Sequence, residues 1–224
     1  MTQEVRVFNI NPEPIGIFSL PPEKHLEFKK SIQSILIEAP DKLRQKFNND
    51  PYSEHICNAS NQNLFNYFPE LNELKSYIKK MLVSYINLIG YECDEFIIHS
   101  SWLNESGKDS KLGFHMHSNS FLSANYYVNF DPENHSLLDF RNDRCDRKMT
   151  AGHQTIVIPN SKQLTIYNSL LVKLPANEGQ VLVWRSHLNH GYNVPNKIGK
   201  RITLSLNAIP KVVDNGRYSF TIQE

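Results

Sequence analysis

Two stretches of the chain repeat apolar residues at the spacing of a helix face. The first predicts a helix from the Pro21-Pro22 pair to about Glu38, because proline is tolerated in a first helical turn. The second predicts a helix over 71–89, with Gly90 as its C-terminal stop. The apolar positions are Phe28, Ile32, Ile35 and Leu36 in the first helix and Leu71, Leu74, Ile78, Leu82, Tyr85, Ile86 and Ile89 in the second.

After Gly90 the apolar pattern changes from helical spacing to alternation, which is typical of β-strands. Strand-like runs also precede the first helix, at 5–10 and 15–18. The segment 40–68 is polar and rich in asparagine, and it predicts short helical pieces at best. The strands expected after Gly90 cover 96–99, 112–117, 121–130, 136–140, 154–158, 171–174, 180–184 and 201–209.

Short strands separated by turns about every ten residues are typical of a sandwich or jelly roll, and not of alternating βαβ units. No repeat, low-complexity run or domain boundary interrupts the 224 residues, a length that suits one domain with a good core. We therefore expect a single α+β domain over 1–224. Its N-terminal strand and supporting helices would occupy 1–92, and its β core would occupy 93–224.

The composition limits which binding partners and which cellular compartment are expected. A net charge of +1 gives no basic surplus, so no nucleic-acid binding is expected. No apolar run approaches the roughly 18 residues of a membrane span, and the first residues lack a signal-type apolar core. Cys57, Cys93 and Cys145 are odd in number and have no C-x-x-C spacing, which favours reduced thiols. These features predict a cytoplasmic protein, a monomer or homodimer, without membrane association.

The main chemical signal is the run His115-Met116-His117. Two histidines at i and i+2 of a strand point to the same side, because side chains alternate between its faces. A third histidine, His190, comes after the strand-like run 180–184. Neutral imidazole is the commonest protein ligand of first-row metals, and three such groups would hold an ion on one triangular face. A His-x-His pair alone is more often packed and hydrogen-bonded, so the prediction of a metal site depends on a further signal downstream of His190.

Arg201 begins the alternating run 201–209, eleven residues after His190. A guanidinium in a mostly apolar strand needs an anionic partner, because an unpaired buried charge is very costly. Its planar fork also suits a carboxylate bidentately. The alternative is an arginine at a strand start that extends to solvent. The histidines and the arginine together predict a mononuclear iron site beside an oxoacid-binding arginine.

With these residues, the chain resembles the double-stranded β-helix (jelly-roll, cupin-like) core of Fe(II)- and 2-oxoglutarate-dependent oxygenases of the prolyl-hydroxylase-like group. It is most similar to a bacterial and phage branch with an H-x-H motif, over 102–209. The matching elements occur in the same order and with similar spacings. They are Trp102-Leu103-Asn104, His115-Met116-His117, Ser123-Ala124-Asn125-Tyr126-Tyr127, Gly179-Gln180-Val181-Leu182-Val183-Trp184, His190 and Arg201-Ile202-Thr203-Leu204-Ser205-Leu206-Asn207.

The resemblance implies a role for the matching residues. His115 and His190 would bind Fe(II), and Arg201 would bind the distal carboxylate of the co-substrate 2-oxoglutarate. The hydroxyls of Tyr127 and Ser205 would donate hydrogen bonds to the same carboxylate. The final residue of the motif, which would also belong to the co-substrate site, is Asn207. The implied cofactors are Fe(II), 2-oxoglutarate and O2.

Position 117 departs from the pattern of the superfamily, most of which has His-x-Asp or His-x-Glu. Imidazole in place of a carboxylate raises the net charge of the iron site by one. Three-histidine sets occur in thiol-dioxygenase-type cupins, which use no oxoacid. Alternatively, His117 lies outside the ligand set, and Asp139 or a group of the substrate replaces it. We favour His117 as the third ligand, because strand alternation places it beside His115.

His187, three residues before His190, is the competing candidate for the distal ligand, and the spacing to Arg201 favours His190. The other histidines lie in helical, polar or turn segments and are expected to be structural: His25, His55, His135 and His153.

The predicted function is a 2-oxoglutarate-dependent dioxygenase, an oxidoreductase. As a hydroxylase it would couple decarboxylation of 2-oxoglutarate to succinate with hydroxylation of a C–H bond. One alternative is a three-histidine cupin-type oxygenase that does not use 2-oxoglutarate, and the other is a non-catalytic jelly roll with a binding or structural role. The substrate would be a small molecule or a peptide, selected by the polar segments 104–112, 141–153 and 159–170.

Overall fold

The computed structural model describes residues 13–47, 50–59, 62–141, 169–214 and 216–223, and it is built around a seven-stranded sheet. Neighbouring strands in this sheet are antiparallel. From one edge to the other the strands are β1 (Gly16–Ser19), β9 (Gln180–Arg185), β6 (Leu122–Asn129), β11 (Arg201–Pro210), β4 (Phe96–Ser106), β3 (Asp50–Ile56) and β2 (Arg44–Phe47).

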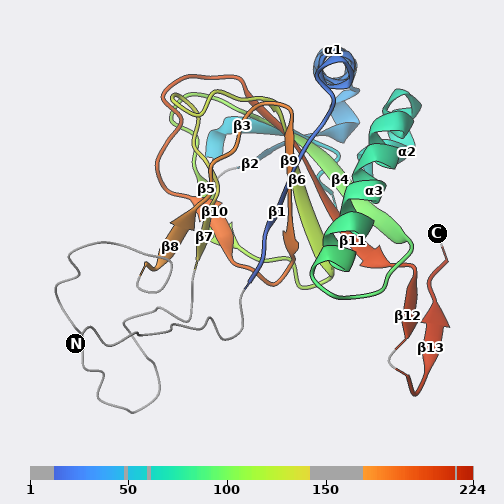
Figure 1. The fold of residues 1–224 in the computed structure, drawn as a ribbon. Helices are drawn as coiled ribbons and strands as arrows, with labels where there is room; N and C mark the ends of the chain where they lie inside the picture. Colours follow the sequence, from blue (N-terminus) through green and yellow to red (C-terminus); the bar gives the residue numbers. More distant parts are fainter. Residues whose placement is uncertain (1–12, 48–49, 60–61, 142–168, 215, 224) are drawn as a thin grey trace, which may run out of the picture.

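A smaller sheet lies on the side of the large sheet that faces away from the helices (Figure 1). Its order is β5 (Leu112–His115), β10 (His190–Tyr192), β7 (Asp139–Arg141) and β8 (Leu171–Lys173). Between the sheets lies an apolar cluster of Tyr127, Phe130, Leu138, Phe140, Ala176, Leu182, Trp184 and Tyr192. Two packed antiparallel sheets of this kind form a jelly roll, and the predicted α+β class is confirmed.

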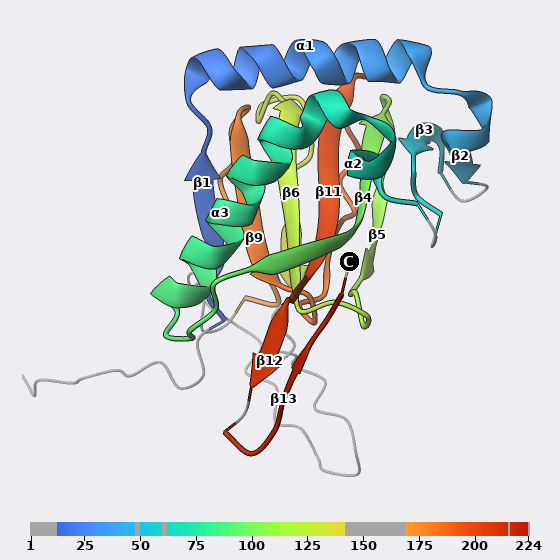
Figure 2. The same ribbon diagram turned by 90° about the vertical axis from the view of Figure 1, so that its right-hand side faces the viewer.

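Two long helices, α1 (Pro22–Glu38) and α3 (Asn72–Leu88), cover the opposite face of the large sheet (Figure 2). Both agree closely with the expected bounds. Gly90 has a φ of +95°, the left-handed conformation that commonly ends a helix. None of the described helices is long and apolar enough to cross a membrane. Shorter elements between the two helices are η1 (Asp41–Leu43), α2 (Leu64–Tyr67) and η2 (Pro69–Leu71).

Strand β11, in the middle of the large sheet, shows how the chain separates its core from its site. Successive side chains of a strand point to opposite faces, so every second residue enters the same compartment. The residues on the helix side belong to the main hydrophobic core and are Ile202, Leu204, Leu206 and Ala208. The residues on the other side line a cavity between the sheets and are Arg201, Thr203, Ser205 and Asn207.

The structure differs most from the sequence prediction within 40–68. This segment contains the antiparallel hairpin β2–β3, where only short helical pieces were expected. Strand β3 borders the cavity, so its inward side chains are polar and no apolar alternation marks it. Strand β4 also continues to Ser106, past the predicted end at 99. Several of its residues face the same polar cavity, so the apolar pattern that predicted the strand stops before the strand ends.

Other differences lie at strand ends. Strand β5 ends at His115, so His117 lies just beyond the regular strand. His190 begins a short strand where a polar break was expected, and a C-terminal hairpin of β12 (Val212–Asp214) and β13 (Ser219–Thr221) was not predicted. The expected strands 5–10 and 154–158, together with Cys145 and His153, lie outside the described residues.

A part-buried polar cluster attaches α1 to the large sheet. His25 contacts the Tyr126 hydroxyl through Nδ1 at 2.7 Å and the Glu178 carboxylate through Nε2 at 3.0 Å. Lys29 Nζ and the backbone N–H of Phe130 donate to the same carboxylate, at 2.8 and 3.1 Å. Burial acts to raise the pKa of Glu178, but these hydrogen bonds outweigh it and hold the pKa below its usual value.

Glu178→Gln should lower the free energy of unfolding by about 1–2 kcal/mol at neutral pH. Hydrogen bonds to a charged group contribute about 1.5–3 kcal/mol, and partial exposure of this carboxylate reduces the effect. Because the folded pKa is depressed, the stabilisation is present above the unfolded pKa of about 4.3 and is lost as the pH falls through the folded value.

Urea unfolding at pH 7 and at about pH 3 measures this difference. The gap between wild type and variant should close in acid, and a gap that persists there would contradict the assignment. Glu27→Gln, which removes an exposed pair with Lys24, is the matched control and should cost less than about 0.5 kcal/mol.

Candidate metal centre

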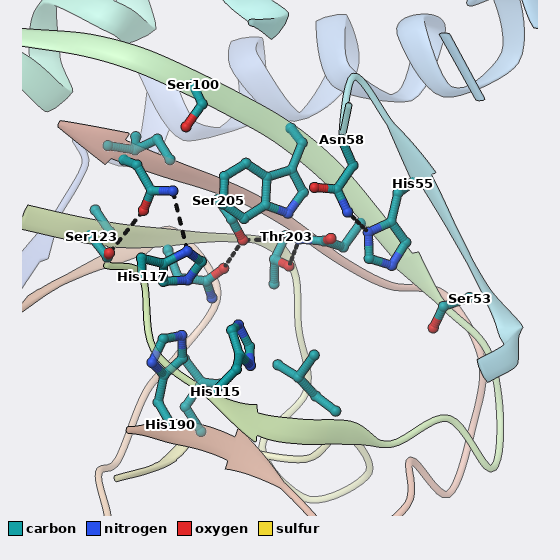
Figure 3. Close-up of a pocket in the computed structure, with 18 of the residues that line it drawn as sticks. Ser53, His55, Asn58, Ser100, His115, His117, Ser123, His190, Thr203 and Ser205 are labelled. Carbon is teal, nitrogen blue, oxygen red and sulfur yellow. Dashed lines mark hydrogen bonds between the residues drawn. The ribbon is translucent and has the colours of Figure 1, made fainter. Parts of the chain in front are cut away.

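Three histidines from two distant segments of the chain converge on one point (Figure 3). His115 ends β5 and His190 begins β10, and the two residues are directly paired in the smaller sheet. His117 lies two residues past the end of β5, where its backbone N–H donates to the carbonyl of Ser186 at 3.0 Å. One nitrogen from each ring lies within 4.8 Å of the others. Within the described ranges, no other group of three or more His, Cys, Asp or Glu side chains is placed to share a metal ion.

Backbone hydrogen bonds set the proton position in two of the rings. His115 Nδ1 donates to the carbonyl of Gly113 at 2.8 Å, and His190 Nδ1 donates to the carbonyl of Leu188 at 2.9 Å. A carbonyl oxygen can only accept, so Nδ1 carries the hydrogen and the Nε2 lone pair of each neutral ring is available. Such partners also fix ring orientation, as is common for metal-binding histidines.

The environment keeps two of the rings neutral. Burial lowers the pKa of His190 to about 3; the hydrogen bond to Leu188 opposes this shift, and the neighbouring imidazoles add to it. Burial, with charge repulsion from His115 and His99, lowers the pKa of His117 to about 4. Neutral imidazole is the form that binds a metal, so no proton has to leave these rings near pH 7.

His117 has a side-chain partner. Its Nδ1 lies 3.2 Å from the amide nitrogen of Asn207, and Asn207 Oδ1 accepts from the Ser123 hydroxyl at 2.9 Å. Ser123 in turn contacts the Ser186 hydroxyl at 2.8 Å. A carboxamide turned by 180° would instead offer Oδ1 to His117, and the serine hydroxyls can adapt to either orientation. Asn207, predicted to bind co-substrate, is therefore a direct neighbour of the third histidine.

The two competing ligand candidates lie elsewhere. Asp139, on β7, is 3.8 Å from Lys173 Nζ and is not part of the histidine cluster. Burial raises the pKa of Asp139, while Lys173 opposes the shift. His187 is exposed, and its Nε2 lies 3.6 Å from the Glu13 carboxylate. The cluster contains His190 and not His187.

The three histidines line a cavity of about 540 Å³ between the two sheets. This volume lies within the roughly 300–1,000 Å³ of small-molecule sites. The wall also includes the inward residues of β11, with Arg201 among them. The metal cluster and the arginine predicted from the sequence therefore share one cavity.

Arg201 is 3% exposed. Its Nε donates to the carbonyl of Ser136 at 3.1 Å, and no carboxylate of the described residues pairs with it. Its guanidinium carbon lies 5.0 Å from the ring centre of Tyr192 and 5.6 Å from those of Tyr127 and Phe130. Aromatic faces attract a cation but do not neutralise it, so the buried charge still lacks an anionic partner.

The other predicted co-substrate residues are placed less directly. The Tyr127 hydroxyl is fully buried near Asn125 and the backbone of Leu138, without a hydrogen bond of acceptable geometry, and Tyr127 does not line the cavity. Ser205 does line it, but its hydroxyl donates to Asn125 and accepts from Asn104, both at 2.9 Å. The Ser205 hydroxyl is therefore already engaged within the sheet.

Two residues that the sequence reasoning missed lie closer to the arginine. Thr203 is on the cavity wall two residues after Arg201, and Tyr192 is on the wall two residues after His190. Side chains two apart on a strand share a face, with a rise of roughly 7 Å, whereas Ser205 is roughly 13 Å along the strand from Arg201. Strand alternation from Arg201 could have identified Thr203, whereas β10 is too short for its own pattern to indicate Tyr192.

Comparison with known proteins agrees with this geometry. Residues 100–207 match the model of a family described as "Putative 2OG-Fe(II) oxygenase". No curated protein matches the sequence.

Several solved structures share the fold at low sequence identity. The epimerase SnoN of nogalamycin biosynthesis, in complex with Fe3+, alpha ketoglutarate and nogalamycin RO, has a TM-score of 0.62 and 9% identity, covering 95% of this chain and 90% of that chain. HygX from Streptomyces hygroscopicus, with nickel, 2-oxoglutarate and hygromycin B, has a TM-score of 0.54 and 11% identity, covering 88% and 83%. A prolyl-4-hydroxylase from Pseudomonas putida has a TM-score of 0.52 and 10% identity, covering 87% and 92%.

The shared fold confirms the double-stranded β-helix that the resemblance implied. The matched residues include all three clustered histidines and Arg201. Over residues 100–207 the chain is therefore similar to Fe(II)- and 2-oxoglutarate-dependent oxygenases, which are oxidoreductases, and it shares their fold.

Proposed function

We propose that this protein is a hydroxylase that holds Fe(II) with His115, His117 and His190 and the distal carboxylate of 2-oxoglutarate with Arg201. One observation carries the proposal. The buried guanidinium of Arg201, without a carboxylate partner among the described residues, lines the same cavity as three converging imidazoles. A buried cation requires an anion, and a dicarboxylate that also reaches a metal ion would supply it.

The short strand β10 links the two groups. It begins with His190, and the ring of Tyr192, two residues later, has its centre 5.0 Å from the Arg201 guanidinium carbon. Both SnoN and HygX were crystallised with a metal ion and 2-oxoglutarate, which supports the same pairing here.

The chain's own part is to bind, orient and shield. Bound Fe(II) would supply oxygen activation and oxidation of the substrate C–H bond. The Nδ1 hydrogen bonds of His115 and His190 hold the rings in the orientation that presents Nε2. The aromatic rings around Arg201 exclude water from the guanidinium, which strengthens its interaction with a carboxylate.

A three-histidine oxygenase that uses no oxoacid is the second candidate, and the imidazole of His117 in place of a carboxylate favours it. That alternative leaves the buried charge of Arg201 without a function. Product analysis separates the two candidates. The protein incubated with Fe(II), 2-oxoglutarate and O2 should form succinate, slowly even without substrate, and a chelator should stop the reaction. Turnover of a thiol substrate without any succinate would favour the second candidate.

Asn207 should act as a positioning residue for His117. If His117 Nε2 binds a metal, Nδ1 keeps its proton, and the Asn207 carboxamide turned by 180° would present Oδ1 as its acceptor. Asn207→Leu should therefore weaken Fe(II) or Co(II) binding about 10–100-fold, the range typical of losing such a partner. Asn207→Asp, which keeps an acceptor, should retain the affinity.

Competition with a chromophoric chelator measures this effect. Ser205→Ala is the matched control, because Ser205 lies on the same strand face but bonds to Asn104 and Asn125. Equal metal affinities in Asn207→Leu and Ser205→Ala would contradict the positioning role.

A further inference from the structure

The cavity extends beyond the metal cluster toward β3 and β4, on the side that Figure 3 labels with Ser53, His55 and Asn58. We call the wall that β4, β3 and the residue Asn58 form the β3–β4 end and define it by His55, Asn58, His99, Ser100 and Trp102; Figure 3 shows Ser100 on the other side of this wall from His55 and Asn58. Three of its five residues precede the family-matched region 100–207. The proposed metal and co-substrate residues are all outside it, so this part of the wall is free to contact a substrate.

The side chains of the β3–β4 end are polar but uncharged. Burial lowers the pKa of His55 to about 4, although the nearby Asp50 opposes the shift, and burial also lowers the pKa of His99. Asn58 Nδ2 lies 2.8 Å from His55 Nδ1, so the two side chains orient each other. His99 has a buried Nε2 without a hydrogen-bond partner in the described structure. The wall therefore presents neutral donors and acceptors, and one of them is unsatisfied.

Two charged residues of the cavity wall, Asp50 and Lys111, lie outside the five residues that define this end. Both carboxylate oxygens of Asp50 are occupied, since Oδ2 accepts from the hydroxyls of Ser53 and Ser110 at 2.7 and 2.8 Å and Oδ1 accepts from the Tyr52 N–H at 3.1 Å. Lys111 is exposed, and its ammonium can remain hydrated. None of the five residues that define the β3–β4 end carries a charge, so a charged group bound against them would lose hydration without gaining an ionic partner among them.

Trp102 provides the one flat apolar surface at this end. Its ring centre lies 5.9 Å from that of His117, with 43° between the planes, so the indole borders the metal cluster. Asn104, two residues later on the same strand, donates to Ser205 and Thr203 at 2.9 and 3.3 Å and anchors this part of β4 to β11. The Trp-x-Asn motif thus holds an aromatic platform beside the proposed iron position.

We propose that the substrate is a neutral, hydroxyl-rich small molecule, with a sugar ring as the unit that stacks on Trp102 and hydrogen-bonds to the His55–Asn58 side. This inference rests on the proposed function. Hydroxyl groups both donate and accept hydrogen bonds, so they can pair with the neutral polar side chains of the β3–β4 end. The C–H face of a sugar ring can stack on the indole of Trp102. An apolar substrate would leave buried polar groups such as His99 Nε2 unpaired, which is unfavourable. A ring stacked on Trp102 would bring its C–H bonds to the metal.

Ligand-observed NMR on the full chain, loaded with Zn(II) and 2-oxoglutarate, tests the proposal. The probes are the methyl glycosides of glucose, galactose and mannose, with glucuronate, glucosamine and a blocked alanine-proline-alanine peptide as charged and peptide comparisons. At least one neutral glycoside should bind at least roughly tenfold more tightly than the charged sugars and the peptide. Trp102→Leu and Asn58→Ala should each weaken that binding about tenfold or more, while Tyr91→Leu, at an exposed tyrosine outside the cavity, should not.

Preferential binding of a charged sugar or of the peptide would overturn the proposal, as would the absence of neutral-sugar binding up to about 20 mM. Equal binding by wild type, Trp102→Leu and Asn58→Ala would also overturn it, because the sugar would then lie elsewhere. Binding of 2-oxoglutarate is measured separately on the same sample. If the oxoacid binds and no sugar does, only the substrate inference fails; if the oxoacid does not bind, the proposed function itself fails.

Discussion

Replacing either His115 or His190 by alanine should abolish stoichiometric Fe(II) binding. Each ring supplies one of the three donors in the cluster, and no carboxylate of the described residues belongs to it. Losing an outer partner of a metal ligand typically costs 10–100-fold in affinity, so losing a ligand itself should cost at least roughly a hundredfold. Anaerobic Fe(II) titration with a competing chelator measures the loss, and circular dichroism checks that each variant is folded.

His187→Ala is the matched control, because His187 is exposed and pairs with Glu13 outside the cluster. It should bind Fe(II) like wild type. His117→Ala should lose affinity as His115→Ala does. If His117→Ala alone kept full affinity, the metal site would have two histidines and a ligand from the substrate. Loss of metal in His187→Ala with retention in His190→Ala would contradict the assigned distal ligand.

Arg201→Gln should weaken 2-oxoglutarate binding by roughly two to three orders of magnitude. Removing one partner of a buried charge pair typically costs about 3–5 kcal/mol, and each 1.4 kcal/mol is a factor of ten. Arg201→Lys should recover only part of the loss, because an ammonium cannot bind a carboxylate bidentately. Fe(II) affinity should change little, since Arg201 is not among the clustered metal donors. Isothermal titration of Fe(II) into each variant, and then of the oxoacid into the Fe(II)-loaded variant, measures the two affinities.

Arg185→Gln provides an arginine control, because Arg185 pairs with Glu13 at 2.6 Å and does not line the cavity. Tyr127→Phe tests a finer point. Removing a hydroxyl that bound the oxoacid would weaken oxoacid binding by about 1–2 kcal/mol. The Tyr127 hydroxyl is buried outside the cavity, so Tyr127→Phe should weaken oxoacid binding much less. Wild-type oxoacid affinity in Arg201→Gln would mean that another cation holds the co-substrate.

The sequence predicted the structure best where the spacing of apolar residues determines whether a side chain enters the hydrophobic core or the cavity. The two long helices have apolar spacing that packs against one face of a sheet, and their bounds were predicted closely. In β11 the alternation of Ile202, Leu204 and Leu206 with polar residues separates core from cavity, and it places Arg201 inside. Burial on one face of a strand is enough to predict such an arrangement.

The sequence was least informative where both partners of an interaction are polar and distant along the chain. Strand β3 forms the β3–β4 end of the cavity with few apolar residues, so nothing distinguished it from a loop. The contact between Asn207 and His117 joins two segments whose proximity depends on the pairing of several strands. Tyr192 was missed because β10 has only three residues, too few for a visible period.

The most direct test of the central claim is an anaerobic titration of the Fe(II)-loaded protein with 2-oxoglutarate, monitored by visible absorption. Chelation of the iron by the oxoacid should produce a weak metal-to-ligand charge-transfer band that saturates at one equivalent in wild type. In Arg201→Gln the same band should appear only at roughly hundredfold or higher oxoacid concentration. A wild-type protein that binds one Fe(II) through its histidines but develops no band with 2-oxoglutarate would contradict the account and leave the three-histidine oxygenase in its place.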